Sequence, residues 1–473
     1  ERSMRVIECD VAIIGGGLGG LTAALRVAEG GKTVIVFEKS PEDRYVNNTR
    51  VCAGVFHLAL TDITADEDLL VEKITTITGG MAEPEQTRAV SRDSRRAVKY
   101  LQSKGVRFMR GSPEPHHNYV LTPPALIRVG LQWEGRAGDV LLRTLDAELT
   151  KLGGTVQRGH AVTAITTEGG AVTGLEGTAA DGAFTVQAAN VIIADGGFPA
   201  DEEMLRKYIT PAPDKVLQRN TRKGAGDGIR MAQAIGGALS ERMDGFYGHV
   251  MHRNAMTNDQ LWPYPWFDDI CTNAIIVRAD GKRFCDEGYG GPHIANRIAA
   301  LDDPLSTWVI FDQPIWEEGG KARSFPANPH METNGGPIER ADTLAELAQK
   351  IGMSAENLMV TVDAYNAAVE AQTTEQLDPP RATFRYKPWK IAKAPFYAGP
   401  ACAGITYTMG GLRIDGLSRV LNAQGAVIPG LYAVGTATGG MEGGDRTGYV
   451  GGLAKTAATA LRAAEHITGD LTA

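Results

Sequence analysis

The chain has few cysteines, few aromatic residues and no long apolar run, and each shortage excludes a class of protein. Its cysteines are scattered, with no CxxC pair and no metal-ligand spacing, so we expect reduced thiols and no metal site. No apolar stretch reaches the roughly 18–20 residues of a membrane span. The first residues, ERSMRVIECD, lack the apolar run of a signal peptide. We therefore expect a cytoplasmic protein with no membrane partner.

The chain has fewer basic than acidic side chains, and it is rich in glycine. A net charge of -8 argues against nucleic acid or an anionic membrane as the main partner. With 473 residues, the chain can form a large core and two domains. Its 57 glycines exceed the usual share of about 7% and lie in short clusters without a period. Such clusters favour close approach of the backbone to a large ligand.

Residues 10–39, DVAIIGGGLGGLTAALRVAEGGKTVIVFEK, contain a complete dinucleotide-binding pattern. A buried strand runs into a turn with Gly15, Gly17 and Gly20, which fit GxGxxG, and a helix and a second strand follow. The helix N-terminus offers N–H groups to a pyrophosphate. The second strand ends at Glu38, where a carboxylate can accept ribose hydroxyls and disfavours the 2′-phosphate of NADP.

The rest of the chain favours FAD over NAD. After Glu38 the sequence turns polar and irregular, as expected of a segment that wraps a longer ligand. Two further apolar strands, in ANVIIADGGF and GLYAVGTATGG, also run directly into glycines. Three such strands suit an extended FAD at the carboxyl ends of one sheet. From these segments we predict cofactor contacts at Lys39, Asn48, Thr49, Ala53, Gly54, Asp195, Gly196 and Gly435.

The order of these segments, with GAGDGIRMAQAIGG, NAIIVRADGKRFCDE and PFYAGPACAGITYTMGGLRID, resembles one flavoprotein family. It is the family of succinate dehydrogenase and fumarate reductase, with its soluble members and the 3-ketosteroid dehydrogenases. The resemblance implies an α/β fold: a Rossmann-like FAD domain of the glutathione-reductase type in two sequence pieces, 1–240 and 391–473, with an α+β capping domain, 241–390, inserted between them. It adds cofactor contacts at Asp227, Gly451, Gly452 and Leu453. The covalent-FAD histidine of the complex-bound enzymes has no counterpart in NNTRVCAG, so FAD is expected to be non-covalent.

The resemblance gives a role to the glycine-rich stretch GGMEGGDRTG. Relatives similar to fumarate reductase carry GGxxGxxRxG, matched here at Gly439, Gly440, Gly443, Arg446 and Gly448. In that pattern the arginine holds a substrate carboxylate, for which its planar guanidinium is suited. The helix predicted after it, GLAKTAATALRAAEHI, would direct its N-terminus at the flavin.

Several positions depart from the family pattern. Tyr407 and Glu442 stand where fumarate reductases often have histidines, and Gly291 falls near their proton-delivering arginine. Tyr289, His293 and Arg297 are possible substitutes for that arginine, and the spacing does not choose among them. Tyr397 matches the tyrosine of a PFYA-like segment in ketosteroid dehydrogenases, although a packing role explains it better, because PFYA recurs across the wider family.

Two further segments stay open. His249 or His252 falls where relatives place a substrate-facing histidine, and LWPYPWF (261–267) either lines the pocket or covers the core. As catalytic or substrate-binding candidates we select Arg446, Tyr407, Tyr397, Arg297 and His249.

We predict an FAD-dependent oxidoreductase that acts on a CH–CH bond next to a carbonyl or carboxylate of a small substrate. One alternative is a dehydrogenase of cyclic or steroid ketones. Others are an electron-transfer subunit of a larger complex and a flavin-binding protein without catalysis. The substrate, the direction of reaction and the external electron acceptor or donor stay unidentified at this level.

Overall fold

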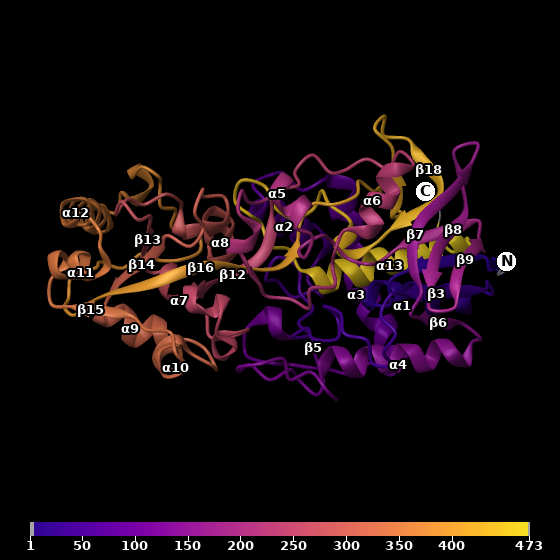
Figure 1. Cartoon of the computed structure of the whole chain (residues 1–473), viewed down its shortest axis with the longest axis horizontal. Coiled ribbons are helices and arrows are strands. Elements are labelled where there is room, and N and C mark those ends of the chain that lie inside the picture. Colours follow the sequence, from indigo (N-terminus) through magenta and orange to yellow (C-terminus); the bar gives the residue numbers. More distant parts are fainter. Residues whose placement is uncertain (1–3, 472–473) are drawn as a thin grey trace.

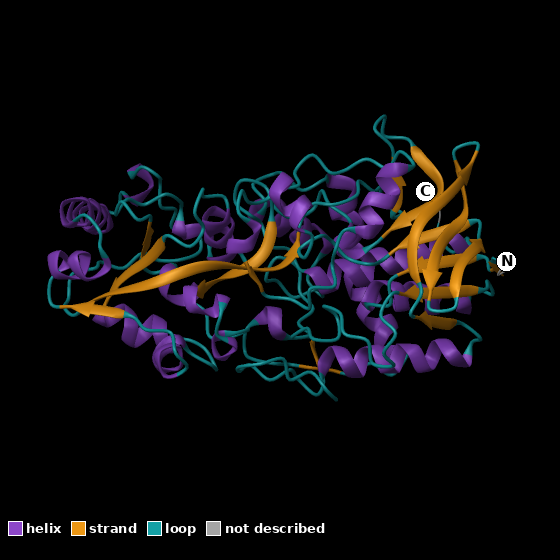
Figure 2. Cartoon of the chain, viewed as in Figure 1, coloured by secondary structure: helices purple, strands orange, loops and turns teal. Residues whose placement is uncertain are grey.

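The computed structural model describes residues 4–471 as an elongated molecule with one large sheet system near each end. Figure 1 shows both chain ends at the same end of the molecule, and Figure 2 shows helices around both sheet systems. Residues 1–3, part of the segment inspected for a signal peptide, lie outside the described residues. Within residues 4–471, no helix combines the length and apolarity needed to cross a bilayer.

The glycine-terminated strands predicted from the sequence lie side by side in a six-stranded sheet. Its order is β17 (Arg419–Leu421), β18 (Val427–Ala433), β10 (Asn190–Ile193), β2 (Val11–Ile14), β3 (Val34–Glu38) and β6 (Thr155–Arg158). All neighbouring pairs are parallel except β17–β18. Strands β2, β10 and β18 therefore end at the same edge, which confirms the prediction that their glycine turns meet.

Helices cover this sheet and form its core. Helix α1 (Leu18–Glu29) packs against α4 (Ala137–Lys151) and α13 (Gly452–Thr468), and α13 also packs against α3 (Pro84–Ser103). Alanines 457, 458, 460, 463 and 464 of α13 are all buried, so their small side chains let the neighbouring helices approach closely. The sequence predicted α1 and α13, and both are confirmed. Nearby lie α2 (Glu67–Ile77), α5 (Glu202–Tyr208) and α6 (Asp227–Ala234).

A smaller sheet flanks the first one. Its order is β1 (Arg5–Glu8), β9 (Gly182–Gln187), β8 (Ala171–Ala179) and β7 (Ala161–Glu168), and β8 also contacts β18. The hairpins β7–β8 and β8–β9 are antiparallel. Strands β4 (Phe108–Met109) and β5 (Val120–Leu121) form a separate short pair.

The second sheet system is built around one long strand, β16 (Phe396–Thr408). In Figure 1 it runs from the far end toward the middle of the molecule. It pairs with β12 (Phe246–His252), β14 (Thr307–Asp312) and β15 (Glu339–Ala341), while β11 (Leu217–Gln218) and β13 (Ile275–Val277) complete the sheet. Both β11 and β16 lie outside the range 241–390 predicted for the insert.

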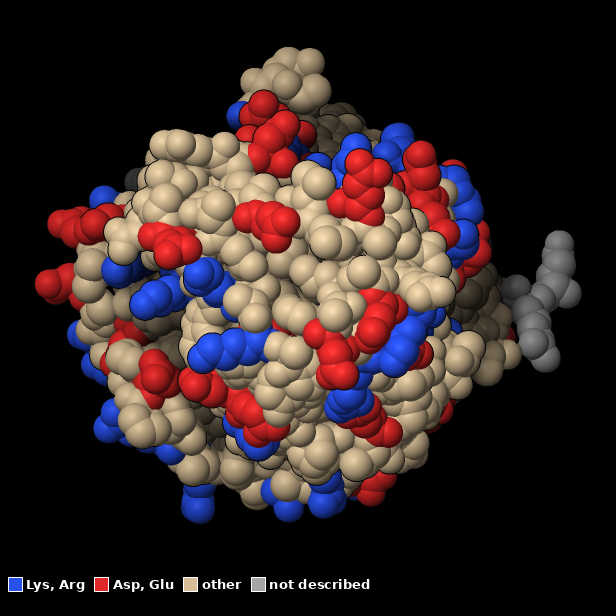
Figure 3. Space-filling view, turned by 90° about the vertical axis from the view of Figure 1, so that its left-hand side faces the viewer, with Lys and Arg blue, Asp and Glu red and all other residues tan. Residues whose placement is uncertain are grey.

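Helices surround this second sheet, all of them short except the last: α7 (Asp268–Cys271), α8 (Gly291–Ala299), α9 (Gln313–Glu318), α10 (Ala327–Thr333), α11 (Leu344–Ile351) and α12 (Ala355–Ala371). The face at this end, seen in Figure 3, carries acidic and basic side chains interspersed among other residues. On this face charge is therefore not gathered into one large patch of a single sign.

Candidate active site

A cavity of about 1000 Å³ lies where the edge of the parallel sheet meets the second sheet system. It receives the glycine turns after β2, β10 and β18 from one side, and β12, the end of β16 and the loop 262–266 from the other. The open question about that loop is thereby answered, because Trp262, Pro263, Tyr264 and Trp266 line the cavity. The volume is at the upper end of what ligand pockets reach.

Most of the residues predicted to contact the cofactor line this cavity, although they are far apart in the sequence. They are Gly15, Gly17, Glu38, Lys39, Asn48, Thr49, Ala53, Gly54, Asp195, Gly196, Asp227, Gly435, Gly452 and Leu453. Gly20 and Gly451 do not line the cavity, but neither position has room for a side chain. A Cβ on Gly20 would lie 1.9 Å from the Gly15 carbonyl oxygen, and one on Gly451 would lie 2.3 Å from that of His57.

The first glycine turn is held in a shape suited to a dinucleotide. Gly15 has φ +102°, which a residue with a side chain rarely adopts. The Glu38 carboxylate accepts hydrogen bonds from the Gly16 N–H (3.3 Å) and the Ser40 N–H (2.7 Å), so it lies beside the turn. Thr49 Oγ1 accepts from the Leu18 N–H at 3.1 Å and ties the polar segment to the start of α1.

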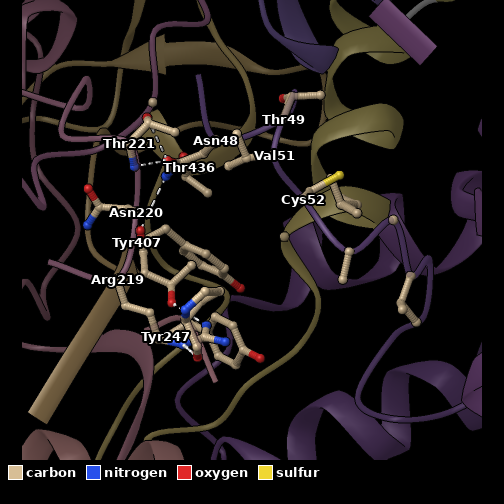
Figure 4. Close-up of a pocket in the computed structure, with 18 of the residues that line it drawn as sticks. Asn48, Thr49, Val51, Cys52, Arg219, Asn220, Thr221, Tyr247, Tyr407 and Thr436 are labelled. Atoms are coloured by element: carbon tan, nitrogen blue, oxygen red, sulfur yellow. Dashed lines mark hydrogen bonds between the residues drawn. The ribbon is translucent and has the colours of Figure 1, made fainter. Parts of the chain in front are cut away.

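The polar segment after β3 also connects the two sides of the cavity. Asn48 Oδ1 accepts from the N–H and the hydroxyl of Thr221 (3.2 and 3.0 Å), and its Nδ2 donates to the Thr406 carbonyl (3.2 Å). Figure 4 shows the contacts between Asn48 and Thr221 together with Thr436 of the third glycine turn. Lys39 and Asp227, both predicted cofactor residues, form an ion pair at 3.6 Å.

Asp195, in the cavity wall, has a buried carboxylate oxygen whose hydrogen-bonding capacity is not satisfied by any group among residues 4–471. Its Oδ2 accepts from the Gly228 N–H at 2.8 Å, whereas its buried Oδ1 has no hydrogen-bond partner among residues 4–471. Burial raises the pKa of this carboxyl to about 7. A buried oxygen without a partner is costly, so the group is prepared for a ligand that supplies a donor.

The predicted catalytic residues divide into two groups. Arg446, Tyr407 and His249 line the cavity. Arg297 is exposed on α8 and does not line it. Tyr397 does not line it either: its hydroxyl contacts Gln313 and its ring stacks on Phe311 at 5.1 Å. Tyr397 and Tyr407 are ten positions apart along the strand, which at about 3.3 Å per residue places them roughly 33 Å apart.

These positions bear on the roles expected from the sequence. The location of Tyr397 agrees with its packing interpretation and leaves it too far from the cavity to handle a substrate proton. Arg297 is exposed outside the cavity, so it is not placed to deliver a proton there as the arginine near position 291 does in the family pattern. Both residues were selected on local motif similarity, which does not report the direction of a long strand or the face of a helix.

Tyr407 is joined to a buried ion pair. Its hydroxyl donates to Glu442 Oε2 (2.9 Å), which also accepts from the Val450 and Gly451 N–H groups (2.9 and 3.3 Å). Glu442 Oε1 lies 3.7 Å from Lys455 Nζ, and neither side chain of this pair is exposed. Burial raises the pKa of Tyr407 well above its ordinary value, and the Glu442 carboxylate adds to this rise, so its phenol stays protonated.

Sequence reasoning missed several cavity residues: Tyr247, Tyr449, His57 and Arg219. The Tyr247 and Tyr449 rings stack at 4.1 Å, and Tyr247 lies 5.3 Å from the Tyr407 ring. Arg219 lies over the rings of Tyr264 and Trp266 (5.0 and 5.4 Å) and donates to Thr406 Oγ1 at 3.2 Å. The one available signal for Tyr247 was its place two residues before His249, which puts both on the same face of a strand.

Comparison with known proteins settles the family. The profile of the family described as "FAD binding domain" matches residues 10–450, nearly the whole chain. The chain belongs to this family. Its cofactor is therefore FAD, which agrees with the glycine turns, Glu38 and the buried Asp195 oxygen that the cavity presents.

Relatives of this FAD-binding chain include the proteins expected from its motifs. It is 26% identical to the NADH:acrylate oxidoreductase of Vibrio harveyi, over 94% of this chain and 49% of that protein. It is 27% identical to a fumarate reductase (cytochrome) of Shewanella frigidimarina, over 93% and 73% respectively. It is 27% identical to the 4-oxocyclohexanecarboxylate 2-dehydrogenase of Sinomonas cyclohexanicum, over 93% and 89%. The predicted resemblance to the fumarate reductase family is confirmed.

The structural comparison agrees on the fold. The 3-ketosteroid-Δ4-(5α)-dehydrogenase of Rhodococcus jostii RHA1 superposes with a TM-score of 0.74 and 21% identity, over 99% of this chain and 98% of that one. The chain spans about half the length of some curated relatives, such as the Vibrio and Klebsiella pneumoniae NADH oxidoreductases (49% and 45%).

The role of Glu38 in holding FAD can be tested directly. We expect Glu38→Ala to weaken FAD binding by about 10- to 100-fold, because a charged hydrogen-bond acceptor contributes about 1.5–3 kcal/mol. The measurement is the FAD dissociation constant from the quenching of flavin fluorescence. Glu42→Ala is the control, since Glu42 is exposed and lies outside the cavity. Equal affinities for the two variants would contradict the assignment.

Proposed function

We propose that this chain is an FAD-dependent oxidoreductase that adds or removes two hydrogens across a CH–CH bond next to a carbonyl or carboxylate. One observation carries the proposal: an arginine without an acidic partner, Arg446, lies in the same cavity as the residues that hold FAD. No carboxylate among residues 4–471 lies within ion-pair distance of its guanidinium. FAD accepts or supplies the hydride, and the chain binds the substrate and handles a proton.

The surroundings of Arg446 leave its charge available for a ligand. Its Nη1 donates to the Thr76 carbonyl at 3.1 Å, and its guanidinium lies over the rings of Tyr289 (5.5 Å) and Phe384 (5.9 Å). These contacts fix the side chain but do not neutralise it, and a guanidinium stays charged at any ordinary pH. A carboxylate or a polarised carbonyl oxygen is the natural partner for such a group.

The proposed architecture follows the family pattern. The FAD domain would consist of residues 1–240 and 391–473, with 241–390 as the capping insert. Strand β16 connects the two parts, because it pairs in the second sheet and its last residues, Tyr407 and Thr408, reach the cavity side. Helix α13 begins at Gly452 on the cavity wall, so its positive end would stabilise negative charge on reduced flavin.

A cyclic ketone is the second candidate substrate. The wall opposite the glycine turns is formed by aromatic rings, with the stacked Tyr247 and Tyr449 beside Tyr407 and the Arg219 guanidinium. Flat apolar faces with a few polar groups suit a ring better than a short chain. The relationship to a 4-oxocyclohexanecarboxylate dehydrogenase supports the same interpretation.

Anaerobic spectroscopy tests the proposed function in both directions. We expect oxidised enzyme to lose its flavin absorbance with a saturated substrate, or reduced enzyme to regain it with an unsaturated one. The probes are succinate, 4-oxocyclohexanecarboxylate and a saturated 3-ketosteroid for the first direction, and fumarate, acrylate and 4-androstene-3,17-dione for the second. If the flavin responds to dithionite and oxygen but to none of these probes, the chain is not an oxidoreductase of this class.

A further inference from the structure

Three polar side chains of the second sheet system form a continuous hydrogen-bonded line into the cavity. Asp268 Oδ2 lies 2.6 Å from His249 Nδ1, and His249 Nε2 lies 2.9 Å from the Tyr247 hydroxyl. Tyr247 and His249 belong to β12, and Asp268 opens α7. All three line the cavity, and β12 places Tyr247 opposite Tyr407 of β16. Figure 4 shows Tyr247 and Tyr407 in one group with Arg219.

The hydrogen bonds assign a direction to this line. Asp268 is held as an acceptor, since its Oδ1 also receives the Val250 N–H at 2.8 Å. The Nδ1 of His249 must therefore donate to Asp268, which leaves a lone pair on Nε2 to accept the Tyr247 O–H. The His249 ring is fixed from one face by Trp266, whose ring stacks on it at 3.8 Å.

The charge state of His249 supports the same direction. Its surroundings include Asp268, Tyr247, Arg219, Arg323 and Trp266. Burial, helped by the two arginines, outweighs the Asp268 carboxylate and lowers the pKa of His249 below its ordinary value. The imidazole is then neutral at neutral pH and can accept a proton through Nε2.

The other two tyrosines of the group lack such a base. The Leu60 N–H donates to His57 Nδ1 at 3.2 Å, so His57 Nε2 carries the hydrogen in the neutral ring and donates to the Tyr449 oxygen at 3.0 Å. Tyr449 cannot pass its proton to that nitrogen. Tyr407 donates to Glu442, which already accepts two backbone N–H groups and is paired with Lys455.

The absence of a side chain at position 291 leaves room for the hydrogen-bonded line Asp268–His249–Tyr247 on this side of the cavity. The family resemblance places the proton-delivering residue of relatives near Gly291, which has no side chain. A Cβ on Gly291 would lie 1.8 Å from Asp268 Oδ2 and 2.2 Å from Asp268 Cγ. A side chain at 291 and the Asp268 carboxylate therefore exclude each other, and this chain has the carboxylate.

We propose that Tyr247 exchanges the substrate proton, with His249 and Asp268 as the relay behind it, in place of a side chain at position 291. The inference rests on the proposed function. In the oxidising direction, the carbon next to the carbonyl gives its proton to the Tyr247 oxygen, and the Tyr247 hydroxyl proton moves to His249 Nε2. The hydride of the neighbouring carbon, and with it both electrons, would pass to bound FAD as the C=C bond forms. Reduction reverses each transfer.

Exchange of carbon-bound hydrogen with solvent isolates the proton step from hydride transfer. The FAD-loaded protein is incubated in D₂O without oxygen with 4-oxocyclohexanecarboxylate, succinate or a saturated 3-ketosteroid, and deuterium in the recovered probe is measured by mass spectrometry. We expect wild type to exchange at least one probe. We expect Tyr247→Phe to lose about 10²- to 10⁴-fold of that rate with normal FAD content, as removal of a general acid–base does.

Two further variants separate the relay from simple packing. Tyr397→Phe removes a phenol hydroxyl of the same sheet that lies outside the cavity, so we expect a loss below about twofold. Asp268→Asn removes the charge that raises the pKa of His249, so the acid limb of the exchange profile should move to lower pH and the plateau should fall. Nitrogen-15 NMR of the histidines should show the Nδ1–H tautomer of His249 in wild type and its loss in Asp268→Asn.

The outcomes distinguish the two proposals. No exchange of any probe by wild type, with no flavin response in the spectroscopic experiment, overturns the proposed function and the relay with it. Wild-type exchange that persists in Tyr247→Phe, or falls equally in Tyr397→Phe, overturns the relay alone. Should Tyr247→Phe fail to bind FAD, the Asp268→Asn profile decides, and an unshifted acid limb overturns the relay.

Discussion

Replacing Arg446 with alanine should lower kcat/KM by about 10²- to 10³-fold while the protein keeps its flavin colour. The expected size follows from the roughly 2–5 kcal/mol that loss of one partner of a buried charged contact costs. FAD binding should persist because Arg446 reaches the cavity from the loop before α13, whereas the glycine turns hold the cofactor. The measurements are steady-state kinetics with the active probe and anaerobic reduction of the flavin.

Arg297→Ala is the matched control for this prediction. Both arginines were selected from the sequence, but Arg297 is exposed on α8 and lies outside the cavity. Its replacement should leave kcat/KM within about twofold, as surface substitutions usually do. If instead the Arg297 variant lost activity and the Arg446 variant kept it, the proposed anchor would be wrong.

Replacing Glu442 with glutamine should destabilise the protein by about 3 kcal/mol or more, the largest stability effect that we expect from one side chain. The substitution leaves Lys455 fully buried without its carboxylate, and breaking one half of a buried ion pair costs about 3–5 kcal/mol. The measurement is urea unfolding of the FAD-loaded protein. Lys321→Met is the control, because the Lys321–Glu317 pair is exposed and should contribute little.

The pH dependence of the Glu442→Gln variant provides an independent check. Burial lowers the pKa of Lys455 in the folded protein, and removing Glu442 should lower it further, since that carboxylate opposes the effect. The unfolded chain then binds a proton that the folded chain does not, so stability rises with pH up to the ordinary lysine pKa of about 10.4. We expect the difference in unfolding free energy between wild type and Glu442→Gln to become smaller between pH 7 and 9.5. The double variant Glu442→Gln, Lys455→Met should be more stable than Glu442→Gln alone.

Glu442 and Arg446, the residues of these two predictions, lie in one loop but have different roles. Glu442 organises the loop from inside through the Val450 and Gly451 N–H groups and holds Tyr407 against the start of α13. Arg446, four residues later, points into the cavity from the same loop. A histidine at 442 could not form the ion pair with Lys455, so the departure from the fumarate reductase pattern has a local physical cause.

The sequence alone determined the cofactor side of this protein. The β2–α1–β3 unit, Glu38 and the glycines after β10 and β18 were predicted because each signal lies within a few residues of the chain. Strand alternation, helix spacing and glycine turns are local properties, and parallel strands that end in such turns must meet at one sheet edge. The residues of the polar segment, among them Asn48 and Thr49, followed from the same argument.

Only the tertiary structure decided the substrate side. Whether Tyr397 or Tyr407 reaches the cavity depends on the direction of a thirteen-residue strand, β16. Whether Arg297 reaches it depends on which face of α8 is buried. The line Asp268–His249–Tyr247 joins a strand to a separate helix, and its place beside Gly291 depends on contacts between segments about twenty residues apart. Local patterns define what each segment is, but packing between distant segments defines which side chains meet.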